Sequence, residues 1–159
     1  MESLATNCEV LRRSLLVYGL NQEQVESIGR LGHTQSFTAG EHLILLGSRD
    51  ADIYVLMDGK VDVLTNDGDK LAELGAGSII GEIAFVDAGP RHAHVVASGF
   101  VTTLRFPAKE LRALLCADKT AGFIVLTNIA RLLASRLRNA DGRLDQLLDH
   151  HQDVWKLCE

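Results

Sequence analysis

Hydrophobic positions follow two different periods along the chain. Near the N-terminus they recur at helical spacing, at Val10 and Leu11 and again at Val25 and Ile28, on either side of Gly19. A group at this spacing buries one face of a helix, and glycine is a common residue at a turn. The pattern predicts two short helices joined by a turn.

From Thr34 to Phe106 the pattern changes to short β-rich runs divided by glycine turns, for example at Gly40 and Gly59. The runs read QSFT, HLILLG, DIYVLM, KVDVLT, KLAELG, AHVVAS and VTTLRF. Many short strands at regular spacing are typical of an antiparallel sandwich or barrel. We therefore expect a mainly β fold with flanking helices, namely a double-stranded β-helix (jelly-roll) barrel with N-terminal helices and a long C-terminal helix.

The chain after the strands is predicted to be helical. Pro107 ends the last run and suits the first turn of a helix because it lacks an N–H group. From about Lys119 onward there is no proline and the apolar spacing is helical throughout. We expect a domain over residues 1–118, consisting of the β-roll and its N-terminal helices, and a long helix over residues 119–159.

The long helix carries a heptad pattern. Its two sets of positions are Leu126, Leu133, Ala140, Leu147 and Val154, and, four places after each of these, Ala130, Leu137, Leu144, His151 and Cys158. Such a seam predicts a coiled coil with a partner helix, and hence a homodimer. The alternative is that the first half of the helix simply packs on the barrel.

Composition narrows the classes of partner. The 21 acidic and 16 basic residues give a formal charge of -5, which opposes broad attraction to nucleic acid or anionic lipid. The three cysteines form no CxxC pair, so we expect neither a disulfide framework nor a zinc knuckle, and a cytoplasmic location fits best. No window approaches the run of about 18 apolar residues that a membrane span needs.

One segment departs from plain strand texture and contains candidate chemistry. A helical turn that begins at Glu82, after the permissive Gly81, would direct free N–H groups at an anion. The Gly89-Pro90 turn would return Arg91 to that helix end, where a guanidinium grips phosphate oxygens. Ala84 and Ala93 are small enough to leave room for a ligand. The segment predicts a compact site for one phosphate and one hydroxyl group.

The string GEIAFVDAGPRHAHVVA resembles the phosphate-binding cassette of the cyclic-nucleotide-binding domain family. That family includes bacterial catabolite activator proteins, regulatory subunits of protein kinase A and cyclic-nucleotide-gated channels. The likeness extends to AGEHLILLG, DIYVLMDGKVDVL and LGAGSIIGE and covers roughly Leu15 to Leu137. It implies a non-enzymatic regulatory sensor that binds cAMP or cGMP and needs no cofactor.

The resemblance implies a role for each matching residue. Arg91 would pair with the cyclic phosphate, Glu82 would accept a hydrogen bond from the ribose 2′-hydroxyl, and backbone N–H groups would complete the anion hole. The ligand-binding residues it implies are Gly81, Glu82, Ile83, Ala84, Arg91, His92 and Ala93. His92 departs from the usual Ala, Ser or Thr and leaves the choice of nucleotide open. Two alternatives are an ordinary salt bridge between Glu82 and Arg91, and a cassette that has lost its ligand.

The resemblance also assigns the base and the output to the long helix. By loose alignment Arg136, Asn139 and Ala140 would cover the base, although solvated positions beside the heptad seam are an equal alternative. Ligand occupancy would move the helix through a hinge near residues 114–121. Because no DNA-reading element follows before Glu159, we expect no direct DNA binding, and a piece of a larger channel, transporter, kinase or transcription factor is the second hypothesis.

A third hypothesis is a barrel metalloenzyme. His92 and His94 form an HxH pair like that of the metal-dependent cupins. Those proteins need a carboxylate four or five residues later, and Ser98 and Gly99 stand there instead. We therefore expect no metal site.

Overall fold

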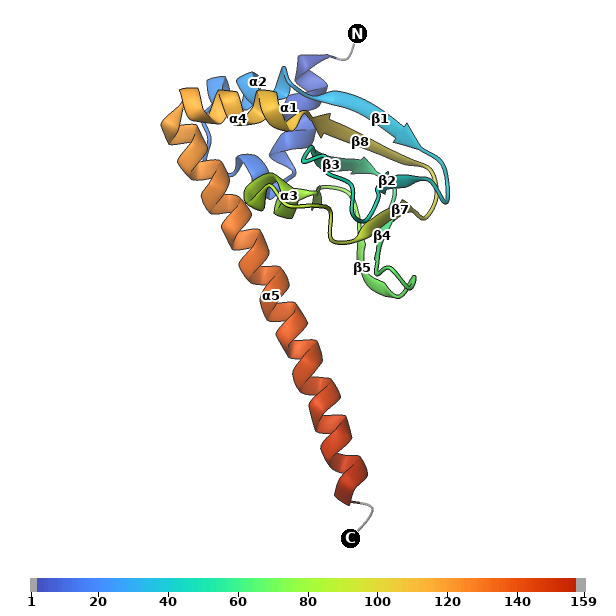
Figure 1. Cartoon of the computed structure of the whole chain (residues 1–159). Coiled ribbons are helices and arrows are strands. Elements are labelled where there is room, and N and C mark those ends of the chain that lie inside the picture. Colours follow the sequence, from blue (N-terminus) through green and yellow to red (C-terminus); the bar gives the residue numbers. More distant parts are fainter. Residues whose placement is uncertain (1–2, 157–159) are drawn as a thin grey trace.

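The computed structural model describes residues 3–156, with side chains as far as residue 142. Its helices are α1 (Leu4–Arg12), the 3-10 helix η1 (Leu15–Val17), α2 (Gln22–Gly29), α3 (Glu82–Asp87), α4 (Ala108–Ala117) and α5 (Lys119–Lys156). Its strands are β1 (His33–Phe37), β2 (His42–Ile44), β3 (Ile53–Asp58), β4 (Val61–Leu64), β5 (Lys70–Leu74), β6 (Ile79–Ile80), β7 (His94–Ala97) and β8 (Val101–Phe106). Figure 1 shows the N-terminal helices and α4 at one end of the strands.

The strands form two four-stranded antiparallel sheets, in the orders β1-β8-β3-β6 and β2-β7-β4-β5. The jelly roll predicted from the sequence is thus confirmed, with N-terminal helices and a long C-terminal helix. The term barrel was wrong, because the two sheets are not closed into one. The two-residue strand β6 was also missed, since its apolar pair is too short to form a run of its own.

Strand β3 lies at the centre of the fold and is buried on both faces. Ile53 and Val55 belong to the core that the helices share with β8, whereas Tyr54 and Leu56 belong to the core between the sheets. Alternate side chains point to opposite faces of a strand. Two covered faces therefore explain why this run is apolar throughout, without the alternation of a half-exposed strand.

Helix α5 is fixed to the N-terminal helices by a buried polar residue. The Asn128 side chain is 1% exposed, and its amide donates to Leu16 O at 3.2 Å and to Tyr18 O at 2.8 Å. A buried amide that satisfies two carbonyl groups specifies one docking position. Beyond this anchor, α5 extends well past the rest of the molecule (Figure 1).

The junction between α4 and α5 is a single extended residue. Asp118 has φ -106° and ψ 91° and breaks the helical path. Its Oδ1 accepts from Ala121 N and its Oδ2 from Gln24 Nε2, each at 3.0 Å. The first contact is an N-terminal cap for α5. This break lies within the hinge expected from the sequence; the division of the chain into two domains there stays a prediction.

Most of the heptad positions whose side chains are described lie on an exposed face of α5. Leu126 is 49% exposed and Leu137 is 62% exposed, while Leu133 is partly buried against the helical core. Phe123 lies three residues before Leu126, the first position of the predicted seam, and is 74% exposed. The later seam positions, Leu144, Leu147, His151, Val154 and Cys158, lie outside the described side chains. Among the described residues, no helix combines the length and apolar character that crossing a membrane requires.

Candidate functional site

A cavity of about 650 Å³ opens where α3 and α5 meet the strands. Every site residue predicted from the sequence contributes to its wall. They are Gly81, Glu82, Ile83, Ala84, Arg91, His92 and Ala93 from the cassette, with Arg136, Asn139 and Ala140 from α5. Residues more than 40 positions apart in the sequence are thus brought to one cavity, large enough for a mononucleotide.

Gly81 is required by the local backbone. Its φ is +89°, in the left-handed region that side chains disfavour. A Cβ atom there would lie 2.6 Å from Arg91 Nη1 and 2.7 Å from Asp52 O. The glycine therefore makes room for the arginine, in addition to the close ligand approach expected from the sequence.

The helical turn predicted after Gly81 is confirmed as α3. No side chain caps its N-terminus, and Ile83 and Ala84 from its first turn line the cavity. The first N–H groups of a helix have no partner within the helix and attract anions. At the other end Ala88 adopts φ 56°, which reverses the chain toward Gly89 and Pro90.

Arg91 is almost completely buried, with its side chain 3% exposed. Its Nη1 donates to Gly81 O at 3.0 Å, and its Nη2 donates to Asp50 Oδ1 at 2.5 Å and to Asp52 O at 2.7 Å. Its Nε is buried without a hydrogen-bond partner within the described part of the chain. The guanidinium is held on the cavity wall, and its Nε–H remains uncommitted.

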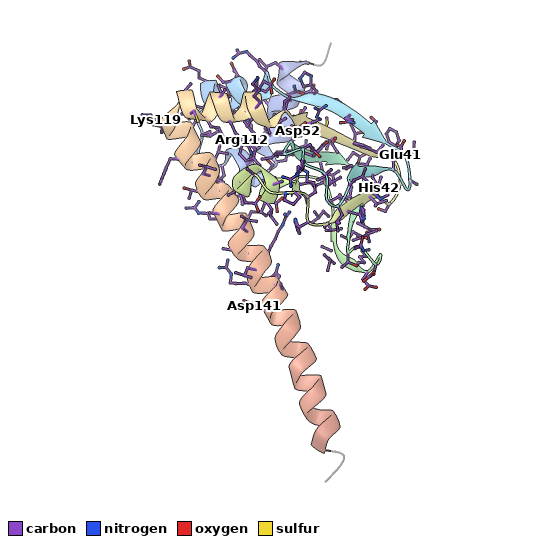
Figure 2. All side chains as sticks on the ribbon, viewed as in Figure 1. Glu41, His42, Asp52, Arg112, Lys119 and Asp141 are labelled. Atoms are coloured by element: carbon purple, nitrogen blue, oxygen red, sulfur yellow. The ribbon has the colours of Figure 1, made fainter. Side chains whose placement is uncertain are left out.

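Asp52 joins the arginine to helix α4. While its carbonyl oxygen accepts from Arg91, its Oδ1 accepts from Ala108 N at 2.8 Å and its Oδ2 from Arg105 Nε at 2.7 Å. Ala108 is the first residue of α4, and Pro107 before it provides no side-chain cap. The Asp52 carboxylate, from a loop distant in sequence, therefore caps the N-terminus of α4. Figure 2 labels Asp52 beside the strands and Arg112 on α4.

Glu82 is buried, with 3% of its surface exposed, and pairs with Arg136 of α5. Arg136 Nη2 also donates to Ile79 O at 2.7 Å. The alternative of a Glu82–Arg91 salt bridge is wrong, since each of these residues has another ionic partner. Arg136 therefore attaches α5 to the cassette, through the carboxylate of Glu82 at the start of α3.

The rest of the cavity wall is largely aliphatic and comes from the strands. These residues are Ile44, Val63, Leu71, Ala72, Leu74, Ile80 and Val95. Sequence reasoning did not assign them to the site. The alternation of side chains along the strands could have indicated them. Val63 is the register partner of both Ala72 and Val95, so the three side chains share one face of the sheet. The cavity therefore has a polar end at the cassette and an apolar wall.

The two histidines of the HxH pair have different surroundings. His92 is exposed and precedes β7, whereas His94 lies in β7, where its Nδ1 accepts from Leu46 N at 3.2 Å. The His94 ring also meets the His42 ring edge to face, with centroids 5.2 Å apart. Within the described residues, no three histidine, cysteine or acidic side chains are grouped as metal ligands.

The fold and the cavity define a jelly-roll domain with a cavity that is polar at the cassette and apolar along the strands. A sequence model described as "Cyclic nucleotide-binding domain" matches residues 34–118, more than half of the chain. The chain belongs to the cyclic nucleotide-binding domain family, as its cassette suggested. Its regulatory relatives include a catabolite activator protein.

Three relatives illustrate the match. The cyclic AMP receptor protein of Thermus thermophilus is 31% identical over 86% of this chain and 63% of its own length. The crystal structure of a cyclic nucleotide-binding domain from Methylobacillus flagellatus has a TM-score of 0.77 and 26% identity, over 88% of this chain and 81% of that one. Glutaminase 2 of Bradyrhizobium diazoefficiens is 29% identical over 86% of this chain but only 22% of its own length. The chain thus spans less than two thirds of either curated relative, and nothing about glutaminase chemistry follows.

Proposed function

We propose that this domain binds a cyclic mononucleotide, cAMP or cGMP, in the cavity between the cassette and α5. The cyclic phosphate would contact Arg91 and the N–H groups of the first turn of α3, while Glu82 would accept a hydrogen bond from the ribose 2′-hydroxyl. The observation that carries the proposal is the buried Arg91, which lines the cavity beside an uncapped helix start and retains an unpartnered Nε. A buried cation with an unused donor favours an anionic ligand.

The base would lie against the aliphatic wall and under α5. That wall offers apolar contact but little hydrogen bonding, and the polar residues that line the cavity apart from Glu82 and Arg91 are Glu73, His92, Arg136 and Asn139. An amide carries a donor and an acceptor and can complement the edge of a purine. We therefore propose Asn139, with Arg136 and Ala140 beside it, as the residues that cover the base.

Occupancy would be transmitted through Glu82 and Arg136. A ribose hydroxyl at Glu82 competes for the carboxylate that now holds Arg136, and so changes the stability of α5 in this position. A ligand shifts a conformational equilibrium by the difference in its affinity for the two states, and such coupling is typically worth about 1 to 3 kcal/mol. The extended residue Asp118 is the proposed hinge.

A homodimer through α5 completes the proposal. Phe123, Leu126, Ala130 and Leu137 follow one another at spacings of three, four and seven and are all exposed. An apolar stripe at heptad spacing on a projecting helix suits a second copy of itself.

The chain is proposed to act as a non-enzymatic regulatory module in the cytoplasm. It would work without a cofactor or metal and without direct DNA contact. The second hypothesis, that it serves as the sensor part of a larger protein, would fit the two curated relatives named above, which are longer than this chain.

Thermal unfolding in the presence of nucleotides tests the function directly. We expect saturating cAMP or cGMP to raise the unfolding temperature, because a ligand that binds only the folded state stabilises it by about 2.7 kcal/mol at 100 times its Kd. The matched control is 5′-AMP, which has the same base and sugar but no cyclic phosphate. A shift with neither cyclic nucleotide, or an equal shift with 5′-AMP, would refute the proposal.

A further inference from the structure

Asp50 contacts the proposed phosphate-binding arginine from outside the cavity. Its Oδ1 accepts from Arg91 Nη2 at 2.5 Å, yet it is not among the residues that line the cavity. The Asp50 side chain is 49% exposed, against 3% for Arg91. A carboxylate from a surface loop therefore reaches a buried guanidinium.

The loop that carries Asp50 is tied to the backbone of Arg91. Gly47 N donates to Arg91 O at 2.7 Å, and Arg91 N donates to Ser48 O at 2.8 Å. The Ser48 hydroxyl lies 3.1 Å from Asp50 Oδ2. These bonds hold both partners of the ion pair in place, so the carboxylate is positioned by the fold.

Among the residues whose side chains are described, three groups accept from the Arg91 guanidinium: the Asp50 carboxylate and the carbonyl oxygens of Gly81 and Asp52. Burial alone would raise the pKa of Asp50, but the hydrogen bond and charge of Arg91, with help from Ser48 and the Asp52 backbone, lower it below its ordinary value. The carboxylate is therefore ionised at neutral pH. The arginine thus has a counter-ion that the protein itself supplies.

Resting on the proposed function, we propose that Asp50 is an affinity-setting residue: it neutralises Arg91 in the free protein and lowers the affinity of the cavity for a cyclic phosphate. Two anions that share one cation repel each other, so the phosphate binds a partly neutralised site. The two carbonyl acceptors position the guanidinium without opposing the ligand.

The substitution Asp50→Asn separates charge from geometry. Asparagine keeps an oxygen that accepts from Nη2 but removes the negative charge. In a calorimetric titration with cAMP and with cGMP, we expect this variant to bind at least about threefold more tightly than the parent, the size expected of a partly screened charge pair. The control Asp67→Asn removes the same charge from the exposed β4–β5 turn and is expected to leave the affinity unchanged.

Thermal unfolding of the same proteins provides a second readout. Ligand-free Asp50→Asn should unfold at a lower temperature than the parent, because a buried arginine has lost its counter-ion, and nucleotide should stabilise it more than it stabilises the parent. Tighter binding by Asp50→Asn, or binding by that variant alone, supports the role. Equal or weaker binding beside a parent that binds overturns this role and leaves the proposed function standing. If neither protein binds either nucleotide, the proposed function falls and the role falls with it.

Discussion

Gly81 and Arg91 depend on each other at the scale of single residues. The arginine side chain fills the space in which a Cβ atom at position 81 would sit, and its Nη1 donates to the Gly81 carbonyl. The positive φ of the glycine also sets the start of α3. One residue without a side chain thus positions both the Arg91 guanidinium and the start of α3.

The substitution Gly81→Ala tests this dependence against a control with the same backbone. Gly40 has a similar φ of +85° but no atom within 4 Å of an added Cβ. Gly40→Ala should lower the free energy of unfolding by about 1 kcal/mol, the cost of a left-handed alanine. Gly81→Ala should cost at least about 2 kcal/mol, because Arg91 must also move. Chemical denaturation measures both, and equal losses would show that the arginine does not depend on the glycine.

The cassette was predictable from sequence and the partners of its arginine were not. Gly81, Glu82 and Arg91 stand within eleven positions of one another and carry a recognisable spacing. Asp50 and Asp52 approach Arg91 from 41 and 39 positions away, in a loop where aspartate is an ordinary turn residue. A polar residue in a loop has no periodicity, so only the folded structure identifies what it contacts.

At the scale of elements, α4 is tied to the site at two points. Its N-terminus is capped by Asp52, and Arg112 Nη2 donates at 2.8 Å to Phe85 O in α3. The Arg112 guanidinium also lies 5.0 Å from the centroid of the Phe85 ring. Because α4 is followed by α5 after the single residue Asp118, these contacts connect Asp52 and α3 to the long helix.

The substitution Arg112→Ala should lower the free energy of unfolding by about 1 to 2 kcal/mol, through loss of one hydrogen bond and one cation–π contact. Lys109→Ala, on the exposed side of the same helix, should change it by less than about 0.5 kcal/mol. Hydrogen exchange should also quicken in α3 in the Arg112 variant alone. Two variants of equal stability and equal exchange would argue against the α3–α4 connection.

The long helix was predictable as an element, but its faces were harder to assign. The sequence indicated its start near Lys119 and its heptad seam. It did not show that Leu133 would pack partly against the core while Leu126 and Leu137 remain exposed. The face of a helix that packs against the core depends on the helices beside it. Here Asn128 fixes that face by its hydrogen bonds to Leu16 O and Tyr18 O, which the sequence of α5 alone does not reveal.

At the scale of the whole molecule, the exposed stripe makes a prediction about assembly. Leu126→Glu with Leu137→Glu should convert dimers to monomers in light scattering, because charges at seam positions oppose coiled-coil packing. Leu133 is left unchanged because it also contributes to the core. The control, Arg131→Gln with Ser135→Glu, changes the net charge equally on exposed positions away from the stripe.

The control pair should remain dimeric, and both variants should unfold cooperatively as the parent does. A parent that is monomeric at high concentration, or a double glutamate variant that is still dimeric, would contradict assembly through α5. The sensing proposal would be unaffected by that result, since the cavity is lined by residues of a single chain.

The central claim is that Arg91 binds a cyclic phosphate, and a calorimetric titration of cAMP and cGMP into the parent and Arg91→Ala tests it most directly. Loss of a charge-assisted contact should cost at least about 2 kcal/mol, which is roughly a 30-fold weaker Kd. Arg91→Lys, which keeps the charge but not the planar fork, should fall between the two and guards against simple unfolding. A parent that binds tightly, with Arg91→Ala folded and binding equally well, would contradict the account.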